Sequence, residues 1–403
     1  MSAPGSAPES GSLRLRALVP SLYAPAFLYS VGQGALVPVI ALAARREGAS
    51  VALAGAVVGL RGIGICIGDV PAGKLVSRLG QRVSTIVASV VMVVAGGAAA
   101  LSASVWVLAL SVLVMGFGWA AWLVARLSLA TDLAPEGRRG QVIAALGGSS
   151  RIGNFVGPLI GAGLITAFGI DAAFWLQGVM VVIGCAALLV FCPPGAAAGN
   201  AGRDHGGVLS SLSAAGVRRV AGPAVGAVAI CALRSSRQAL LPLWASHIGV
   251  DAAGVSLVFG VSSGLDMLLF APAGYASDRW GRKVVALSCL AVLAVGHLLI
   301  PLTGDFTGLM AVGLLLGFGN GLGSGIVMTM GADLAPPVGR PAFLGLWRFV
   351  ADVGTAGGPF VVSAVAALTA LMPAAIAVGA VGLVVAVGLR ARMPDPSPGA
   401  VAR

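Results

Sequence analysis

Charged side chains inside long apolar stretches are the residues of this chain whose types could do chemistry. Six arginines occupy such stretches: Arg61, Arg126, Arg151, Arg234, Arg237 and Arg348. The acids there are Asp266 and Asp352, with Asp69 near the end of another stretch. Each charge placed in hydrocarbon costs about 2.5–3.5 kcal/mol, so we expect these groups to face a partner or a wet cavity. Groups held in this way can bind a charged solute or exchange a proton.

The two kinds of charge predict different roles. Asp266 and Asp352 are the candidate proton carriers, because a carboxylate in a low-dielectric site can take up a proton and a nearby arginine opposes that uptake. The candidate substrate-binding or gating charges are Arg61, Asp69, Arg151, Arg234, Arg237 and Arg348. For Arg126, a structural pair with Asp132 or with a neighbouring helix is the simpler interpretation. The excess of arginine favours anionic or neutral polar solutes.

The elements that position these charges are predicted to be membrane-spanning helices. Hydrophobic residues make up 58% of the chain and charged residues only 10%, whereas soluble domains carry about 25% charge. Twelve apolar segments are long enough to span a bilayer, the seventh being 219–246, and lipid forces each of them to be helical. We predict the following organisation: an N-terminal tail (1–16), a six-helix bundle (17–192), a linker (193–218), a second six-helix bundle (219–390) and a C-terminal tail (391–403).

A repeat with a constant offset of 201 positions relates the two bundles. The repeated residues include Asp132 and Asp333, Gly157 and Gly358, Arg78 and Arg279, and Gly116-Phe117-Gly118 and Gly317-Phe318-Gly319. Such a repeat predicts two equivalent halves related by a pseudo-two-fold axis along the membrane normal. In an apolar chain, this indicates a transporter with its substrate site at the interface between the halves.

The loop charges predict orientation and exclude other classes. Lysine and arginine concentrate in the even-numbered loops, the central linker and both tails, whereas the odd loops hold only Arg45 and Arg46. Both termini of this multi-pass protein are therefore expected in the cytoplasm, with the chain in the plasma (inner) membrane. The net charge of +11 does not indicate nucleic-acid binding, because the basic residues lie in short loops. Without a catalytic triad, a metal cluster or a phosphate-binding loop, we expect neither an enzyme nor a cofactor.

One loop carries a recognisable motif, Gly274-Tyr275-Ala276-Ser277-Asp278-Arg279-Trp280-Gly281-Arg282-Lys283. It resembles the signature loop of the major facilitator superfamily. Gly281 permits a tight turn between antiparallel helices, and Asp278 can pair with Arg282. The resemblance assigns a conformational-switch role to Gly274, Asp278, Arg279, Gly281, Arg282 and Lys283, and to Gly73, Arg78, Gly80 and Arg82 in the first half. The first-half loop has Ser77 where the family has aspartate and glutamine at one basic position, so Asp69 is a candidate substitute.

The fifth predicted helix carries a second motif, formed by Gly153, Gly157, Pro158 and Gly161. It resembles the Gly-Pro motif of the superfamily's drug:proton antiporters, although Ala162 replaces the last glycine. The arginine that the family has in helix 4 is absent, with Val112 near its place. The superfamily fold places helix 2 beside helix 11 and helix 5 beside helix 8. Three pairs across the halves are therefore expected: Arg61 with Asp352, Asp69 with Arg348, and Arg151 with Asp266.

The resemblance implies a secondary active transporter that works by alternating access. The leading hypothesis is proton-coupled efflux of a drug-like or metabolite amphiphile, neutral or anionic, of the kind that can confer multidrug resistance. Its partners would be the lipid bilayer, the substrate and protons, with the chain acting as a monomer. An importer or anion exchanger of a small organic anion is the alternative within transport. A membrane sensor or scaffold that does not transport is the alternative from a different class.

Overall fold

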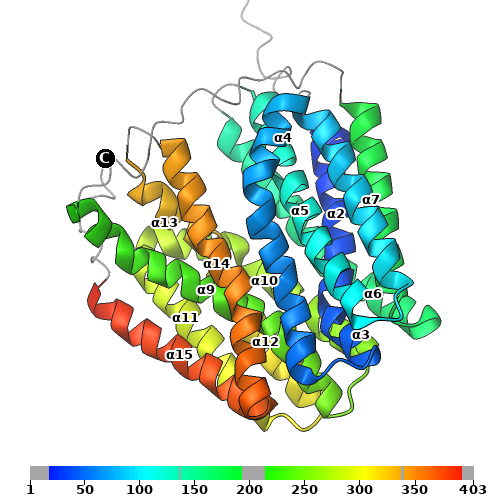
Figure 1. Ribbon diagram of the computed structural model, residues 1–403. Helices are drawn as coiled ribbons and strands as arrows, with labels where there is room; N and C mark the ends of the chain where they lie inside the picture. Colours follow the sequence, from blue (N-terminus) through cyan, green and yellow to red (C-terminus); the bar gives the residue numbers. More distant parts are fainter. Residues whose placement is uncertain (1–17, 136–137, 193–213, 337–339, 393–403) are drawn as a thin grey trace, which may run out of the picture.

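The structure is a computed structural model that describes residues 18–135, 138–192, 214–336 and 340–392. Every regular element in these ranges is a helix, and most helices run the length of the molecule (Figure 1). Eleven spans of the described chain are long and apolar enough to cross a membrane. The predicted span 219–246 is not among them, but it is helical as part of α9 (Ala214–His247). Its apolar stretch is interrupted by Arg234 and Arg237, which lower its hydropathy.

The first half begins with a span that changes helix type along its length. This span is built from a π-helical turn (Val19–Tyr23), α2 (Ala24–Leu36), a 3-10 turn (Val37–Val39) and α3 (Ile40–Arg46). The remaining helices of this half are α4 (Val51–Ala100), α5 (Val105–Leu133), α6 (Arg139–Phe168) and α7 (Ala172–Phe191). The long α4 contains two predicted spans. They are separated at Gly80, where the backbone leaves the helical region.

The second half repeats this arrangement with one interruption. After α9 come α10 (Ala252–Trp280), α11 (Arg282–Leu299), a 3-10 turn (Ile300–Leu302), α12 (Phe306–Leu322), α13 (Ile326–Leu334), α14 (Arg340–Leu368) and α15 (Leu371–Arg392). The tenth predicted span is therefore divided between α12 and α13 at residues 323–325, where Gly325 has a φ of 81°.

The backbone itself repeats at the 201-residue offset. Gly80 has a φ of 77° and Gly281 a φ of 91°, a region that residues with a Cβ rarely occupy. At the other end of the helices, Gly48 and Gly249 have φ values of 87° and 80°. We call the end of the bundle with the Gly80 and Gly281 turns the terminal end, and the end with the Gly48 and Gly249 turns the distal end. The equivalent turns confirm that the two halves share one fold.

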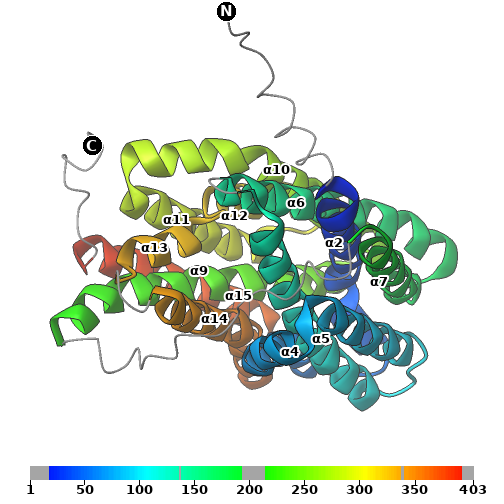
Figure 2. The same ribbon diagram turned by 90° about the horizontal axis from the view of Figure 1, so that it is seen from above.

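Two helix pairs form the seam between the halves. In both views α4 lies beside α14, and α6 lies near α10 (Figures 1 and 2). On α4, a Cβ added at Gly59 or Gly62 would lie 2.7 Å from Phe360 and 2.6 Å from Ala356 of α14. At the second contact, Gly260 of α10 packs in the same way against Leu159 of α6. These are the neighbours that the sequence predicted.

One hydrophobic core contains residues of both halves, and its first-half members all lie toward the distal end. Its first-half members come from the distal parts of their helices, in the ranges 36–58, 95–115 and 165–174. They pack with residues of α9, α10 and α14, including Leu240, Phe259 and Val362. The terminal part of the first half has a separate core around Leu22, Leu129 and Leu146, with no described residue of the second half in it. The described halves are therefore packed together at the distal end.

The glycines of the helix-5 motif are a packing device that occurs twice. A Cβ at Gly153 or Gly157 of α6 would overlap backbone oxygens of α2. The residues 201 positions later, Gly354 and Gly358 of α14, lie equally close to backbone oxygens of α9. Each half thus uses the same Gly-x-x-x-Gly face to bring two helix backbones together. The pattern in helix 5 follows from this shared packing.

Replacing Gly157 with alanine is expected to destabilise the protein by about 1–3 kcal/mol, because the new methyl group meets a backbone oxygen that cannot move aside. The melting temperature of the purified protein in detergent measures this effect. Gly163→Ala on the same helix is the matched control, since nothing lies within 4 Å of its Cβ position. The control should be neutral or stabilise by up to about 1 kcal/mol. Equal effects of the two changes would contradict the packing role.

Candidate functional site

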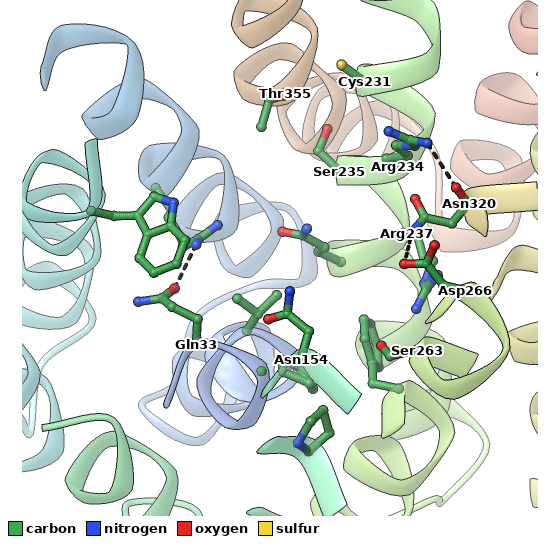
Figure 3. Close-up of a pocket in the computed structure, with 18 residues that line it drawn as sticks. Gln33, Asn154, Cys231, Arg234, Ser235, Arg237, Ser263, Asp266, Asn320 and Thr355 are labelled. Atoms are coloured by element: carbon green, nitrogen blue, oxygen red, sulfur yellow. Dashed lines mark hydrogen bonds between the residues drawn. The ribbon is translucent and has the colours of Figure 1, made fainter. Parts of the chain in front are cut away.

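A cavity of about 350 Å³ lies at the seam between the two halves (Figure 3). The first half lines it with Gln33, Arg61, Trp119, Asn154 and Pro158 among others. The second half contributes chiefly Arg234, Arg237, Phe259, Asp266 and Asn320. The cavity adjoins the shared distal core, because Phe259 belongs to both. Lining residues therefore come from both halves of a single chain, as expected for a transport site.

The first-half arginine of the cavity is held by neutral groups. Arg61 donates from Nη2 to Oε1 of Gln33 at 2.7 Å, and its guanidinium lies 5.9 Å from the centre of the Trp119 ring. The predicted ion pair with Asp352 was wrong, because Asp352 lies instead with Arg348 and Asp69. Gln33 is buried, and its Nε2 atom has no hydrogen-bond partner. This side of the cavity therefore presents hydrogen-bond donors.

The second-half arginines lie one turn apart on α9. Arg234 donates from Nη2 to the backbone oxygen of Asn320 at 2.9 Å, close to the break between α12 and α13. Arg237 is only 7% exposed and lies 5.0 Å from the centre of the Phe259 ring. The Nε atoms of both arginines are buried without a hydrogen-bond partner.

Asp266 is the most thoroughly hydrogen-bonded acid of the site. It accepts from Nη1 of Arg151 at 3.1 Å, which confirms the predicted pair between α10 and α6. It also accepts from Nδ2 of Asn320 at 2.9 Å and from Oγ of Ser324 at 2.8 Å. Sequence reasoning missed Asn320 and Ser324. A signal for Asn320 existed, since it follows the repeated Gly317-Phe318-Gly319 motif and stands 201 positions after Trp119.

A second charged cluster joins α4 to α14. Nη2 of Arg348 lies 3.8 Å from Oδ1 of Asp69, which confirms that predicted pair, and Nε lies 3.6 Å from Oδ2 of Asp352. The carboxyl groups of Asp69 and Asp352 are close enough to interact directly. Oδ1 of Asp69 and Oδ2 of Asp352 are buried and accept no hydrogen bond. Sequence reasoning placed Asp69 near Arg348 but missed that it also lies beside Asp352.

The turn at Gly281 ties together three segments of the second half. Arg282 lies 2.5 Å from Oδ1 of Asp278, as predicted, and also donates from Nε to Oδ2 of Asp333 at 3.1 Å. Asp333 belongs to the repeated Asp-Leu-Ala-Pro motif, whose spacing alone did not predict this contact. Arg279 donates to Oη of Tyr275 at 2.8 Å, and Lys283 is half-buried. No neighbour lies within 4 Å of the Cβ position of Gly274.

The turn at Gly80 keeps one of these contacts, with a neutral donor in place of the arginine. Gln81, 201 positions before Arg282, donates from Nε2 to Asp132, the equivalent of Asp333. Ser77 stands at the position equivalent to Asp278, so the first half lacks both the arginine and its aspartate partner. Arg82 donates to the backbone oxygens of Leu189 and Cys192 at 2.7 and 3.2 Å, at the end of α7. The two other switch residues predicted here, Arg78 and Gly73, are exposed.

Arg126 has a structural environment away from the cavity. It donates from Nη1 to Oγ of Ser150 on α6 at 2.7 Å and lies 4.3 Å from the centre of the Trp122 ring. Of the two partners expected for it, the neighbouring helix is correct. Asp132 accepts from Gln81 instead.

Comparison with solved structures supports the fold. A transporter of the POT family in complex with a thioalcohol-conjugated peptide superposes with a TM-score of 0.79 at 12% identity, over 93% of this chain and 96% of that one. A mutant of the nucleoside transporter NupG gives a TM-score of 0.78 at 14% identity, over 95% of this chain and all of that one.

Curated relatives match shorter stretches of the sequence. The inner membrane transport protein YajR of Escherichia coli strain K12 is 30% identical over 168 residues, 41% of this chain and 36% of that protein. The bacillibactin exporter of Bacillus subtilis strain 168 is 30% identical over 100 residues, 24% of this chain and 25% of that protein. The arabinose-proton symporter of the same strain is 27% identical over 88 residues, 22% of this chain and 19% of that protein. The matches thus span about a third or less of these relatives.

The sequence model of the Major Facilitator Superfamily matches residues 22–233 and again residues 224–403. The two matches fall on the two halves that enclose the cavity. With the duplicated helical fold, the cavity at its seam and these matches, the chain belongs to the major facilitator superfamily.

Proposed function

We propose that this protein is a secondary transporter that couples the efflux of a small amphiphile, neutral or anionic, to proton movement. The observation that carries the proposal is the polar cavity at the seam, lined by arginines of both halves. A site placed there is exposed to alternate sides of the membrane when the halves rock about it. Because one chain lines the whole cavity, a monomer suffices.

The described conformation suits the state that is open toward the terminal end. The halves share a hydrophobic core at the distal end, whereas the terminal part of the first half has its own. Arg82, Arg279 and Arg282 lie at the terminal end, and Arg45 and Arg46 at the distal end. The positive-inside rule supports a cytoplasmic terminal end, and with it cytoplasmic termini in a plasma-membrane protein.

Two arguments bear on the direction of transport. The bacillibactin exporter supports export, although only 24% of this chain matches it. The Gly-Pro motif of helix 5 supports export less than its resemblance implied, because Gly354 and Gly358 form the same contact in helix 11. The arginines of the cavity favour an alternative, the exchange or import of a small organic anion. In proton-coupled import, protons would move in the same direction as the anion.

The proton site that the geometry favours is the carboxyl pair of Asp69 and Asp352. Asp266, the other candidate, already accepts hydrogen bonds from three side chains, so both of its oxygens have donors. Asp69 and Asp352 have one arginine between them and two acceptor atoms without donors. Two like charges this close are relieved when one proton is shared. The pair also bridges the halves, so rocking changes its surroundings.

Purified protein in proteoliposomes tests the proposal. With a pH gradient imposed and a pH dye enclosed, addition of a substrate should move protons in the direction opposite to substrate flux. A growth-inhibition and accumulation screen on cells lacking the gene supplies the substrate candidates. Substrate flux without any linked proton movement would remove the coupling. Absence of substrate-dependent flux altogether would favour the alternative of a membrane sensor or scaffold on the same fold.

A further inference from the structure

The cavity holds more buried positive charge than its own acid can balance. Arg61, Arg234 and Arg237 line it, and Asp266 is the one carboxylate among the lining residues described. The charge of Asp266 is already engaged by Arg151, which lies 3.1 Å away. Buried charges are costly unless they are paired. The balance therefore calls for a negative charge from an occupant of the cavity.

Three buried side-chain polar atoms of the described lining residues have no hydrogen-bond partner, and all three are donors. They are Nε of Arg234, Nε of Arg237 and Nε2 of Gln33. Arg237 is only 7% exposed, and the structure gives its guanidinium a ring contact with Phe259. Leaving a buried donor unsatisfied costs about 1–3 kcal/mol, and more for charged groups. An acceptor-rich, anionic group removes this cost, whereas a cation or an apolar solute does not.

Apolar and aromatic side chains complete the wall of the cavity. Phe259 and Trp119 each stand beside an arginine, and Val37 and Pro158 add to this surface. Gln33, which accepts from Arg61, lies in the first half, on the side of the cavity opposite Arg234 and Arg237 of the second half (Figure 3). Arginines on both sides of the seam make the potential inside the cavity positive, which favours an anion there. The geometry is that of a site with a charged head position and an apolar body position.

We infer that the cavity binds an organic anion, with its carboxylate, phosphate or sulfonate head at Arg234 and Arg237 and its apolar body against Trp119 and Phe259. The inference deepens the proposed function, since it rests on this cavity being the transport site. It narrows the substrate from a neutral or anionic amphiphile to an anionic one. Arg61 approaches the same anion from the first half, so the occupied site joins the two halves.

Three probes with one aromatic body and different heads test the inference. The full chain, purified in detergent in a low-chloride buffer, is melted with naphthoate, naphthylmethanol or naphthylmethylamine. Naphthoate should raise the melting temperature in a saturable way, because a ligand that binds only the folded state stabilises it. The alcohol should give a smaller shift, and the amine none. Equal shifts with the acid and the alcohol, or a larger shift with the amine, would overturn the inference.

Substitutions of single arginines test where naphthoate binds. Arg237→Gln and Arg61→Gln should each weaken naphthoate binding roughly tenfold, the loss expected for one charged hydrogen-bond partner. Arg126→Gln is the matched control: Arg126 is buried like the others, but it contacts Ser150 and Trp122 outside the cavity. Its naphthoate response should equal that of the wild type. If Arg237→Gln does not fold, Arg61→Gln and Arg237→Lys serve, and the lysine variant, which keeps the positive charge, should still respond more to naphthoate than to naphthylmethanol.

Failure of this inference and failure of the proposed function give different results. A charge-selective response to naphthoate without substrate-linked proton movement in proteoliposomes would leave the anion site and remove the coupled transport. Proton-linked flux of neutral or cationic solutes, with no preference for naphthoate, would leave the transporter and remove the anion site.

Discussion

Asp352→Asn is expected to abolish transport driven by a pH gradient while leaving exchange of labelled for unlabelled substrate intact. Asparagine keeps the size of the side chain but cannot release a proton, so it imitates the state in which the pair with Asp69 holds its shared proton. The halves can still rock around a loaded cavity, which is all that exchange requires. Proton-linked flux and counterflow, measured on the same proteoliposomes, separate the two activities.

Asp69→Asn is expected to give the same separation, because the two carboxyl groups share one site. The double variant should be no worse than either single one, since residues that act as a unit are not additive. The control is Asp171→Asn, an exposed acid that pairs with Arg46 at the distal end of the first half. A variant of Asp352 that still accumulates substrate against a gradient would rule out the pair as the coupling site.

Asp266→Asn is expected to lower stability by about 3 kcal/mol, toward the lower limit for breaking a buried ion pair, because Arg151 loses its acid while it is partly buried. The double change Arg151→Gln with Asp266→Asn should recover most of that loss, since no unpaired charge is left. The melting temperatures of the two single variants and the double variant form a cycle that isolates the pair.

The ion pair of Arg46 with Asp171 is the matched control for that cycle. Its two side chains are 42% and 36% exposed, and exposed pairs contribute little. Asp171→Asn should therefore shift stability by less than about 1 kcal/mol. If Asp171→Asn and Asp266→Asn shift the melting temperature equally, the pair of Arg151 and Asp266 stabilises the protein no more than an exposed ion pair does.

The depth of each charged residue in the membrane could be predicted from the sequence. The direction in which its side chain points around the helix axis could not. Arg151 with Asp266 and Asp69 with Arg348 were predicted from matching depth on neighbouring helices, and both pairs exist. Arg61 failed by the same method. It lies eight positions before Asp69, which turns its side chain by about 80° around the axis at 3.6 residues per turn. It therefore faces Gln33 and the cavity.

The same limit explains the carboxyl pair. Arg348 and Asp352 are four residues apart and share a face of α14, so an arginine that reaches Asp69 brings Asp352 with it. The spacing was visible in the sequence, but the rotation of α14 against α4 was not. That rotation is set by close contacts such as Gly62 against Ala356, which depend on the packing of the whole helix pair.

The fold class could be predicted because composition, span length and the 201-residue repeat can be read directly from the sequence, without knowledge of tertiary contacts. The break in the tenth span was harder, although Gly321, Gly323 and Gly325 gave a signal for it. Because apolar residues flank this glycine cluster on both sides, the sequence fits a broken membrane-spanning helix as well as a continuous one. The structure shows the break in the backbone at Gly325, and Arg234 and Ser324 make tertiary contacts beside it.

The break between α12 and α13 divides the tenth span into two helices joined by a short connection, residues 323–325. The shorter helix, α13, is fastened to the Gly281 turn through Arg282 and Asp333, and to α14 through the bond from Nε1 of Trp347 to the oxygen of Val327 at 2.7 Å. The connection contains Ser324, which donates to Asp266 beside the cavity. We therefore expect a displacement of the Gly281 turn to reach Ser324, and through it Asp266, along α13.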